Sequence, residues 1–165
     1  MITAAFIYDL DGTLIDLPIN YSAMFSEFKQ IMGVQEVRPI LKTVAEIKDA
    51  TTRKRVFDAW ERYEMAVVQR TIYHEEGIRI YRAHADKPNA LVTMQSKKTA
   101  KTILDKFNMD FKAIITREDS FSRAEQLKMA AAKLDVPLKN ILFVGNMDND
   151  AEAAKTVGCQ FKLVK

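Results

Sequence analysis

Hydrophobic and polar positions divide the chain into stretches of different period. Residues 4–8 form a continuous apolar run that stops at Asp9, which is typical of a buried strand followed by a polar turn. From about residue 21 to residue 85 the apolar positions recur at helical spacing, as Phe28 and Met32 do. This pattern predicts about three or four helices and no strand in that stretch.

After Pro88 the pattern changes again, and short apolar runs alternate with helical segments. The apolar runs cover 90–92, 113–115, 141–144 and 159–163, and the helical segments lie near 97–107, 124–134 and 150–157. Such alternation is typical of a parallel sheet with helices on both faces. We therefore expect a Rossmann-like, doubly wound α/β core from residues 1–15 and 88–165. We also expect an all-helical unit of residues 16–87, a small cap domain, to be inserted after the first strand.

Acidic residues follow the predicted strands at the edge where such sheets bind their ligands. The first strand ends at Asp9-Leu10-Asp11-Gly12-Thr13, and the strand of 141–144 ends at Gly145-Asn146-Met147-Asp148-Asn149-Asp150. Asp9 and Asp11 point to the same side of the chain, and Gly12 lets the backbone turn away. The shared edge predicts a hard-oxygen site of the kind that Mg²⁺ prefers. The alternative is a solvated turn with Asp148 and Asp150 as helix caps.

Two further positions could hold an anion at this edge. Thr93 follows an apolar run and precedes a predicted helix start, so its hydroxyl and the free amides would form an anion pocket. Ser122-Arg123-Ala124-Glu125 matches a helix-capping box, which places Arg123 in the first turn above the sheet. Lys128 competes for the role, but it falls inside the helix beside the apolar stripe. On this geometry we favour Arg123.

Together these motifs resemble the haloacid dehalogenase (HAD) superfamily. The run from Asp9 to Thr13 matches its first motif, Asp-x-Asp-Gly-Thr, and Thr93, Arg123 and the acidic run after residue 144 stand where its other motifs fall. The likeness covers essentially the whole chain, with the helical insertion in the place of the family's cap. The phosphoglycolate-phosphatase-like branch is nearest in layout.

The resemblance implies a phosphatase that works through an aspartyl-phosphate. Asp9 would be the nucleophile, and Asp11 the general acid and base. An acid at the position of Asp11 favours phosphoryl over halide chemistry. The phosphoryl group would be held by Thr93 and Arg123, together with Gly12 and Thr13. The resemblance also implies Mg²⁺, bound by Asp9, Asp11, Asn146 and Asp150.

The sequence departs from the family pattern at two positions. Arg123 replaces the usual lysine of the third motif, which keeps the charge but changes its shape. Asn146 stands where the fourth motif usually has an aspartate, and an amide oxygen adds no charge to a metal site. Three alternatives follow: a phosphatase with modest metal affinity, one that recruits Asp148, or a module that binds phospho-ligands without turnover. A phosphomutase would use the same residues.

Composition limits the partners. The chain has 165 residues, with 25 Lys and Arg against 22 Asp and Glu, a formal charge of +3, and one cysteine. This mild excess suits an anionic small molecule and does not call for nucleic acid. The resemblance implies that this molecule is a small phosphorylated metabolite. No secretory-type N-terminus or apolar run of membrane-spanning length stands out, and a single cysteine forms no internal disulfide. We expect a soluble, cytoplasmic protein without a membrane partner; its oligomeric state is open.

Overall fold

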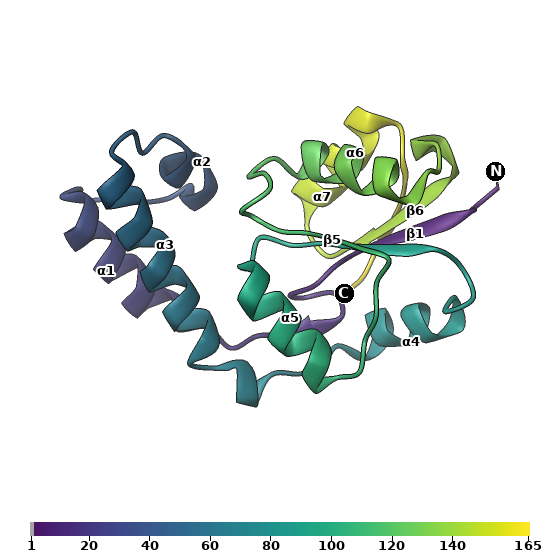
Figure 1. Cartoon of the computed structure of the whole chain (residues 1–165), viewed down its shortest axis with the longest axis horizontal. Coiled ribbons are helices and arrows are strands. Elements are labelled where there is room, and N and C mark those ends of the chain that lie inside the picture. Colours follow the sequence, from purple (N-terminus) through teal and green to yellow (C-terminus); the bar gives the residue numbers. More distant parts are fainter. Residues whose placement is uncertain (1) are drawn as a thin grey trace.

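A computed structural model describes residues 2–165 and contains a five-stranded parallel sheet (Figure 1). The strand order is β5-β4-β1-β6-β7. The strands are β1 (Ala5–Asp9), β4 (Asn89–Val92), β5 (Ala113–Ile115), β6 (Ile141–Gly145) and β7 (Gln160–Leu163). They lie within a residue or so of the predicted apolar runs. The doubly wound α/β fold is confirmed.

Both faces of the sheet are covered by helices. Helices α6 (Arg123–Leu134) and α7 (Asp148–Val157) pack on the face that carries Ala5 and Ile7. Helices α4 (Glu75–Ala83) and α5 (Lys97–Lys106) lie over the opposite face, which carries Phe6 and Tyr8. Because alternate residues of β1 enter two different cores, the whole strand is buried. This explains the unbroken apolar run of the sequence.

The register brings the ends of the strands together. Asp9, the last residue of β1, pairs with Val92 of β4, and Tyr8 pairs with Val144 of β6. The loops that follow β1, β4 and β6 therefore leave the sheet at one edge. This edge faces the side of the molecule on which the insertion lies (Figure 1).

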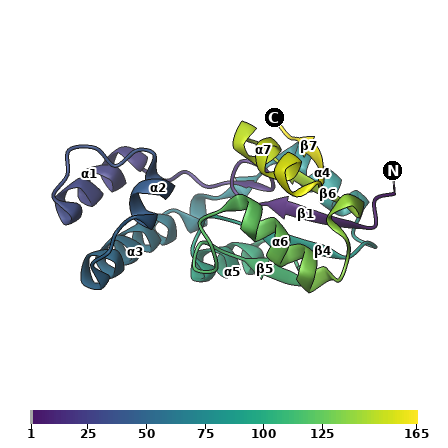
Figure 2. The ribbon, with the colours of Figure 1, turned by 90° about the horizontal axis from the view of Figure 1, so that it is seen from above.

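The insertion forms a small helical unit beside the core, and its three helices are called the cap below (Figures 1 and 2). It consists of α1 (Tyr21–Met32), α2 (Ile40–Ala45) and α3 (Ala50–Met65), and the short 3-10 helix η1 (Val68–Arg70) follows. The helices α1 and α3 pack through Phe28 and Trp60, whose rings meet edge to face with centroids 5.8 Å apart. A second 3-10 helix, η2 (Leu138–Asn140), leads into β6 in the core.

Two features of the inserted stretch differ from the prediction. The expectation that it lacks a strand was wrong, because β3 (Ile72–Tyr73) pairs antiparallel with β2 (Ile15–Asp16). A pairing of two residues is too short to leave an alternating pattern in the sequence. Helix α4 falls within the range predicted for the cap, yet it packs on the sheet, where Tyr81 meets Tyr8 edge to face. An amphipathic pattern shows that a face is buried, but not against which body it packs.

Candidate active site

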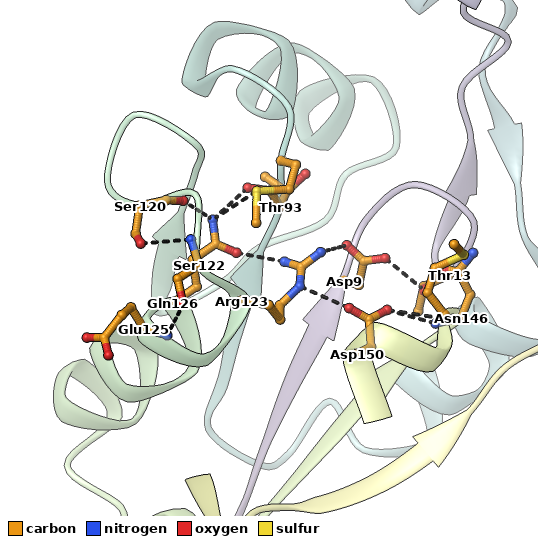
Figure 3. A network of polar contacts seen from close by, with 12 residues as sticks. Asp9, Thr13, Thr93, Ser120, Ser122, Arg123, Glu125, Gln126, Asn146 and Asp150 are labelled. Carbon is orange, nitrogen blue, oxygen red and sulfur yellow. Dashed lines mark hydrogen bonds and ion pairs between the residues drawn. The ribbon is translucent and has the colours of Figure 1, made fainter. Parts of the chain in front are cut away.

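A cavity of about 220 Å³ opens at the carboxyl edge of the sheet. Five of the predicted site residues line it: Asp9, Asp11, Arg123, Asn146 and Asp150. They come from the end of β1 and the turn after it, the start of α6, and the turn between β6 and α7 with the first turn of α7. Figure 3 shows Asp9, Arg123 and Asp150 pointing toward one another. The structure thus brings together residues that are up to 141 positions apart (150 − 9).

The turn after β1 is tight and depends on a glycine. Gly12 has a φ of +79°, a left-handed conformation that side chains disfavour. A Cβ atom at this position would lie 2.2 Å from Nδ2 of Asn146, so the glycine also makes room for that side chain. On either side of it, Asp11 Oδ1 accepts a hydrogen bond from the amide of Leu17 at 2.9 Å, and Thr13 Oγ1 lies 3.3 Å from Asp9 Oδ2.

Arg123 is the basic residue of the site. It is the first residue of α6, whose cap is Ser122, as the capping motif predicts. Its Nη2 donates to Asp9 Oδ1 at 3.0 Å, and its Nε donates to Asp150 Oδ1 at 3.0 Å. Lys128, the competing candidate, instead pairs with Glu125 at 3.1 Å on the exposed face of the helix. The geometry therefore supports Arg123 over Lys128 as the cation beside Asp9.

Asp150 shapes the turn between β6 and α7. Its Oδ2 accepts hydrogen bonds from the amides of Asn146 at 3.3 Å and Met147 at 3.2 Å, while its Oδ1 is held by Arg123. Both carboxylate oxygens are thus engaged with the protein. Gly145 permits this, because a Cβ there would lie 2.7 Å from Asp150 Oδ2. The expected role of Asp150 as a metal ligand stays a prediction.

Burial dominates the electrostatics of Asp9, at the end of β1, and of Asp11 in the turn after it. It raises the pKa of Asp9 to about 7, against the opposing effect of the Arg123 guanidinium, and the charge of Asp150 adds to the rise. Burial also raises the pKa of Asp11, although the Leu17 amide stabilises its charged form. Asp11 therefore keeps its proton to a higher pH than a free aspartate does. A general acid needs this property.

The oxygen atoms of the site fit a hard cation. Within residues 2–165, no three His, Cys, Asp or Glu side chains are grouped to hold a metal ion. However, Asp9 Oδ2 and Asn146 Oδ1 converge on Thr13 Oγ1, at 3.3 Å and 3.4 Å, beside the Asp11 turn. A carboxylate oxygen and an amide oxygen are donors that Mg²⁺ accepts. With Asp150 paired to Arg123, the set carries one free negative charge or less, so affinity should be lower than with an aspartate at position 146.

Thr93 lies next to the cavity but does not line it. Its side chain is fully buried, and its hydroxyl donates to Gln95 Oε1, while the Gln95 amide donates back to Thr93 Oγ1 at 3.1 Å. Gln95 and Met94 line the cavity in its place, together with the exposed Met147. Asn149 lines the cavity as well, and none of these four residues is among those predicted from the sequence. The only signal was their place directly after predicted strands.

The fold and the site define a doubly wound α/β protein with a helical insertion and an acidic site at the carboxyl edge of its sheet. The sequence profile of haloacid dehalogenase-like hydrolases matches residues 6–164. The chain therefore belongs to the haloacid dehalogenase-like hydrolase family, as the motifs after the strands indicate.

Solved structures of the same fold come from several organisms. A haloacid dehalogenase-like hydrolase from Streptococcus pneumoniae has a TM-score of 0.72 and 17% identity, over 99% of this chain and 85% of that one. A predicted phosphoglycolate phosphatase from Haemophilus somnus has a TM-score of 0.69 and 20% identity, over 96% and 84% of the two chains. A search of curated proteins finds no match. At these identities the likeness shows the fold.

No helix within residues 2–165 combines the length and the apolar composition needed to cross a membrane. The location of the protein in the cytoplasm stays a prediction.

Proposed function

We propose that this protein is a Mg²⁺-dependent phosphatase that hydrolyses a small phosphate monoester, a phosphorylated metabolite, through an aspartyl-phosphate. The observation that carries the proposal is the contact between Arg123 and Asp9 at 3.0 Å, in a cavity that Asp11 also lines. A nucleophile, an anion-binding cation and an acid therefore meet at one point. This is the set of groups that phosphoryl transfer needs.

Asp9 attacks phosphorus and forms the new P–O bond, and the bond to the leaving alcohol breaks. Asp11 gives its proton to the alcohol oxygen as that bond breaks. A water molecule then attacks phosphorus, Asp11 takes its proton, and the P–O bond to Asp9 breaks. The products are the alcohol and inorganic phosphate, and both aspartates return to their starting states.

Arg123 holds the phosphoryl oxygens and spreads their charge in the transition state. Thr93 supports this pocket through its contact with Gln95, which lines the cavity. When Mg²⁺ is bound, it reduces the repulsion between the carboxylate nucleophile and the anionic substrate. The residues that would hold it are Asp9, Asn146 and the backbone carbonyl of Asp11.

The proposal is tested with an aryl phosphate, such as p-nitrophenyl phosphate, and a panel of phosphorylated metabolites at increasing Mg²⁺. We expect Asp9→Asn to lower turnover by about 10⁴-fold, because the nucleophile is lost. Asn146→Asp should lower the Mg²⁺ concentration that gives half of the maximal rate. Asp110→Asn serves as the control, because this carboxylate is exposed on the surface of the α/β part of the chain, and it should change neither quantity.

Absence of turnover by the wild-type protein across the panel would contradict the proposal. One observation favours a second function: Asn146 removes a charge from the metal site, and Asp150 is fully engaged by the protein. A module that binds phospho-ligands without turnover would bind inorganic phosphate and leave the aryl phosphate intact. A phosphomutase would transfer the phosphoryl group to a sugar hydroxyl and remains an alternative within the same chemistry.

A further inference from the structure

Gln126 is a fully buried polar residue one helical turn beyond Arg123 in α6 (Figure 3). It lies on the stripe of the helix that faces the sheet, next to the buried Leu127 and Ala130. A glutamine in such a place costs stability unless its amide is fully hydrogen-bonded. Its partners therefore reveal what the residue does.

The nitrogen and the oxygen of the Gln126 side-chain amide contact groups of opposite kind. Its Nε2 faces the carbonyl oxygens of Thr93 at 3.0 Å, Thr116 at 3.1 Å and Ser120 at 3.0 Å. Its Oε1 accepts from Nη1 of Arg123 at 2.7 Å. Carbonyl oxygens only accept hydrogen bonds and a guanidinium only donates them, so a flipped amide would face like groups on both sides. The orientation of the side chain is thereby fixed.

The three carbonyls belong to the loops that follow β4 and β5. Gln126 thus joins both loops to the guanidinium of Arg123, which Asp9 and Asp150 hold from the other side. An arginine carries five N–H donors. Nε, Nη1 and Nη2 each use one in these contacts, so within residues 2–165 one N–H stays free on each terminal nitrogen.

We propose that Gln126 is a positioning residue, which fixes the Arg123 guanidinium so that its two remaining N–H groups are aimed at the oxygens of a phosphoryl group. This inference rests on the proposed function, because it assigns Arg123 to the substrate. A guanidinium held on three sides loses little further freedom when an oxyanion binds, so binding is stronger than with a mobile side chain.

A purely structural role for Gln126 makes a different prediction. If the residue only satisfied the three carbonyls, its loss would weaken the fold, and any effect on ligand binding would be independent of Arg123. If it acts through Arg123, its loss should matter only when Arg123 is present. A double-mutant cycle separates these two cases.

The cycle compares the wild-type protein with Gln126→Met, Arg123→Lys and the double variant. The measured quantity is the Kd of inorganic phosphate by calorimetry, with Mg²⁺ present and at a temperature where circular dichroism shows all four proteins folded. We expect Gln126→Met to weaken binding about 10-fold in the wild-type background, the effect of one charge-assisted hydrogen bond. In the Arg123→Lys background it should weaken binding by no more than about 2-fold. Lys128→Met, on the exposed face of the same helix, is the matched control and should leave Kd unchanged.

Equal weakening in both backgrounds, or none in the wild-type background, would overturn the positioning role. If Gln126→Met does not fold, the wild-type protein still provides a test by NMR. A guanidinium held by Gln126 gives a slowly exchanging signal for the Nη1–H that donates to Gln126, assigned by its loss in Arg123→Lys. An Nη1–H in fast exchange with water would overturn the proposal.

Turnover of the aryl phosphate separates the two proposals. A protein that turns over the ester but gives an additive cycle loses only the positioning role. A protein that binds inorganic phosphate and gives the expected cycle, but does not turn over the ester, keeps the positioning role and loses the proposed catalysis. If it neither binds phosphate nor turns over the ester, both proposals fall.

Discussion

Some residues of the site can be predicted from their neighbours in the sequence, and others only from the three-dimensional structure. Asp9, Asp11, Gly12 and Thr13 are predictable because four neighbouring positions carry the whole motif. Gln126 is not predictable, since its partners come from loops that follow two other strands. A polar residue on an apolar stripe is a signal that some partner exists. It does not name the partner.

Tyr8 precedes Asp9 and offers a test of how tightly this strand is packed. Its ring is buried, and within residues 2–165 its hydroxyl has no hydrogen-bond partner. Burial raises the pKa of this hydroxyl, so it stays protonated at neutral pH. An unpaired buried hydroxyl is unfavourable. We expect Tyr8→Phe to raise the free energy of unfolding by about 1 kcal/mol, measured by urea denaturation.

Tyr81→Phe is the matched control for this prediction. The Tyr81 hydroxyl donates to the carbonyl oxygen of Asp110 and accepts from the amide of the same residue, both at 3.1 Å. Its removal should lower stability by about 1 kcal/mol. A loss of stability in Tyr8→Phe similar to that in Tyr81→Phe would show that the Tyr8 hydroxyl has a partner in solution.

At the scale of elements, strong periodic patterns lead to correct predictions and short contacts do not. The helices after residue 88 are amphipathic, and the structure places them close to the predicted ranges. The pairing of β2 with β3 and the docking of α4 depend on contacts between distant segments. The amide of His74, just before α4, donates to the carbonyl oxygen of Leu14 at 2.9 Å. Helix α4 thereby supports the turn that carries Thr13.

Gly77 is the point at which α4 meets this turn. A Cβ atom at Gly77 would lie 1.6 Å from the backbone carbonyl oxygen of Thr13, so the helix and the turn have to separate in Gly77→Ala. Although alanine favours helix, we expect a net loss of about 1–3 kcal/mol in the free energy of unfolding from overpacking. Because Thr13 contacts Asp9 and Asn146, turnover should fall as well.

Arg79→Ala, at an exposed position of the same helix, is the control and should stay within about 0.5 kcal/mol of the wild-type protein. Denaturation curves and aryl phosphate assays of both variants test the prediction. Wild-type stability and turnover in Gly77→Ala would show that α4 does not hold the Thr13 turn in place.

At the scale of the whole molecule, the sequence indicates two units, but not how they are joined. The change from helical to alternating pattern near residue 88 separates the insertion from the rest of the core. One link between cap and core is a fully buried ion pair: Glu64, near the end of α3, lies 2.7 Å from Nη1 of Arg117 in the loop after β5. Charged residues on helices are usually exposed, so the sequence gives no reason to bury this one.

The surroundings of the pair fix the end of the cap on the core. Glu64 also accepts from the Ser96 amide at 3.3 Å and from the Thr99 hydroxyl at 3.1 Å. The Arg117 guanidinium lies 4.3 Å from the ring centroid of Trp60 in the cap. Burial raises the pKa of Glu64, and the Arg117 guanidinium acts against this rise.

We expect Arg117→Met to lower the free energy of unfolding by about 3–5 kcal/mol at pH 8, because it leaves the Glu64 carboxylate buried without its cation. The loss should shrink as the pH falls toward 5. The pKa of Glu64 is raised in the folded state, and the loss of Arg117 raises it further. The folded variant therefore binds a proton at a pH where the unfolded chain does not, and this proton binding stabilises the folded state. Urea denaturation across this pH range measures both effects.

Arg62→Met is the control: it breaks an exposed pair with Glu27 and should cost no more than about 1 kcal/mol, with little change over the same pH range. A pH-independent loss in Arg117→Met would show that Arg117 acts through its packing on Trp60, and not through the charge of Glu64.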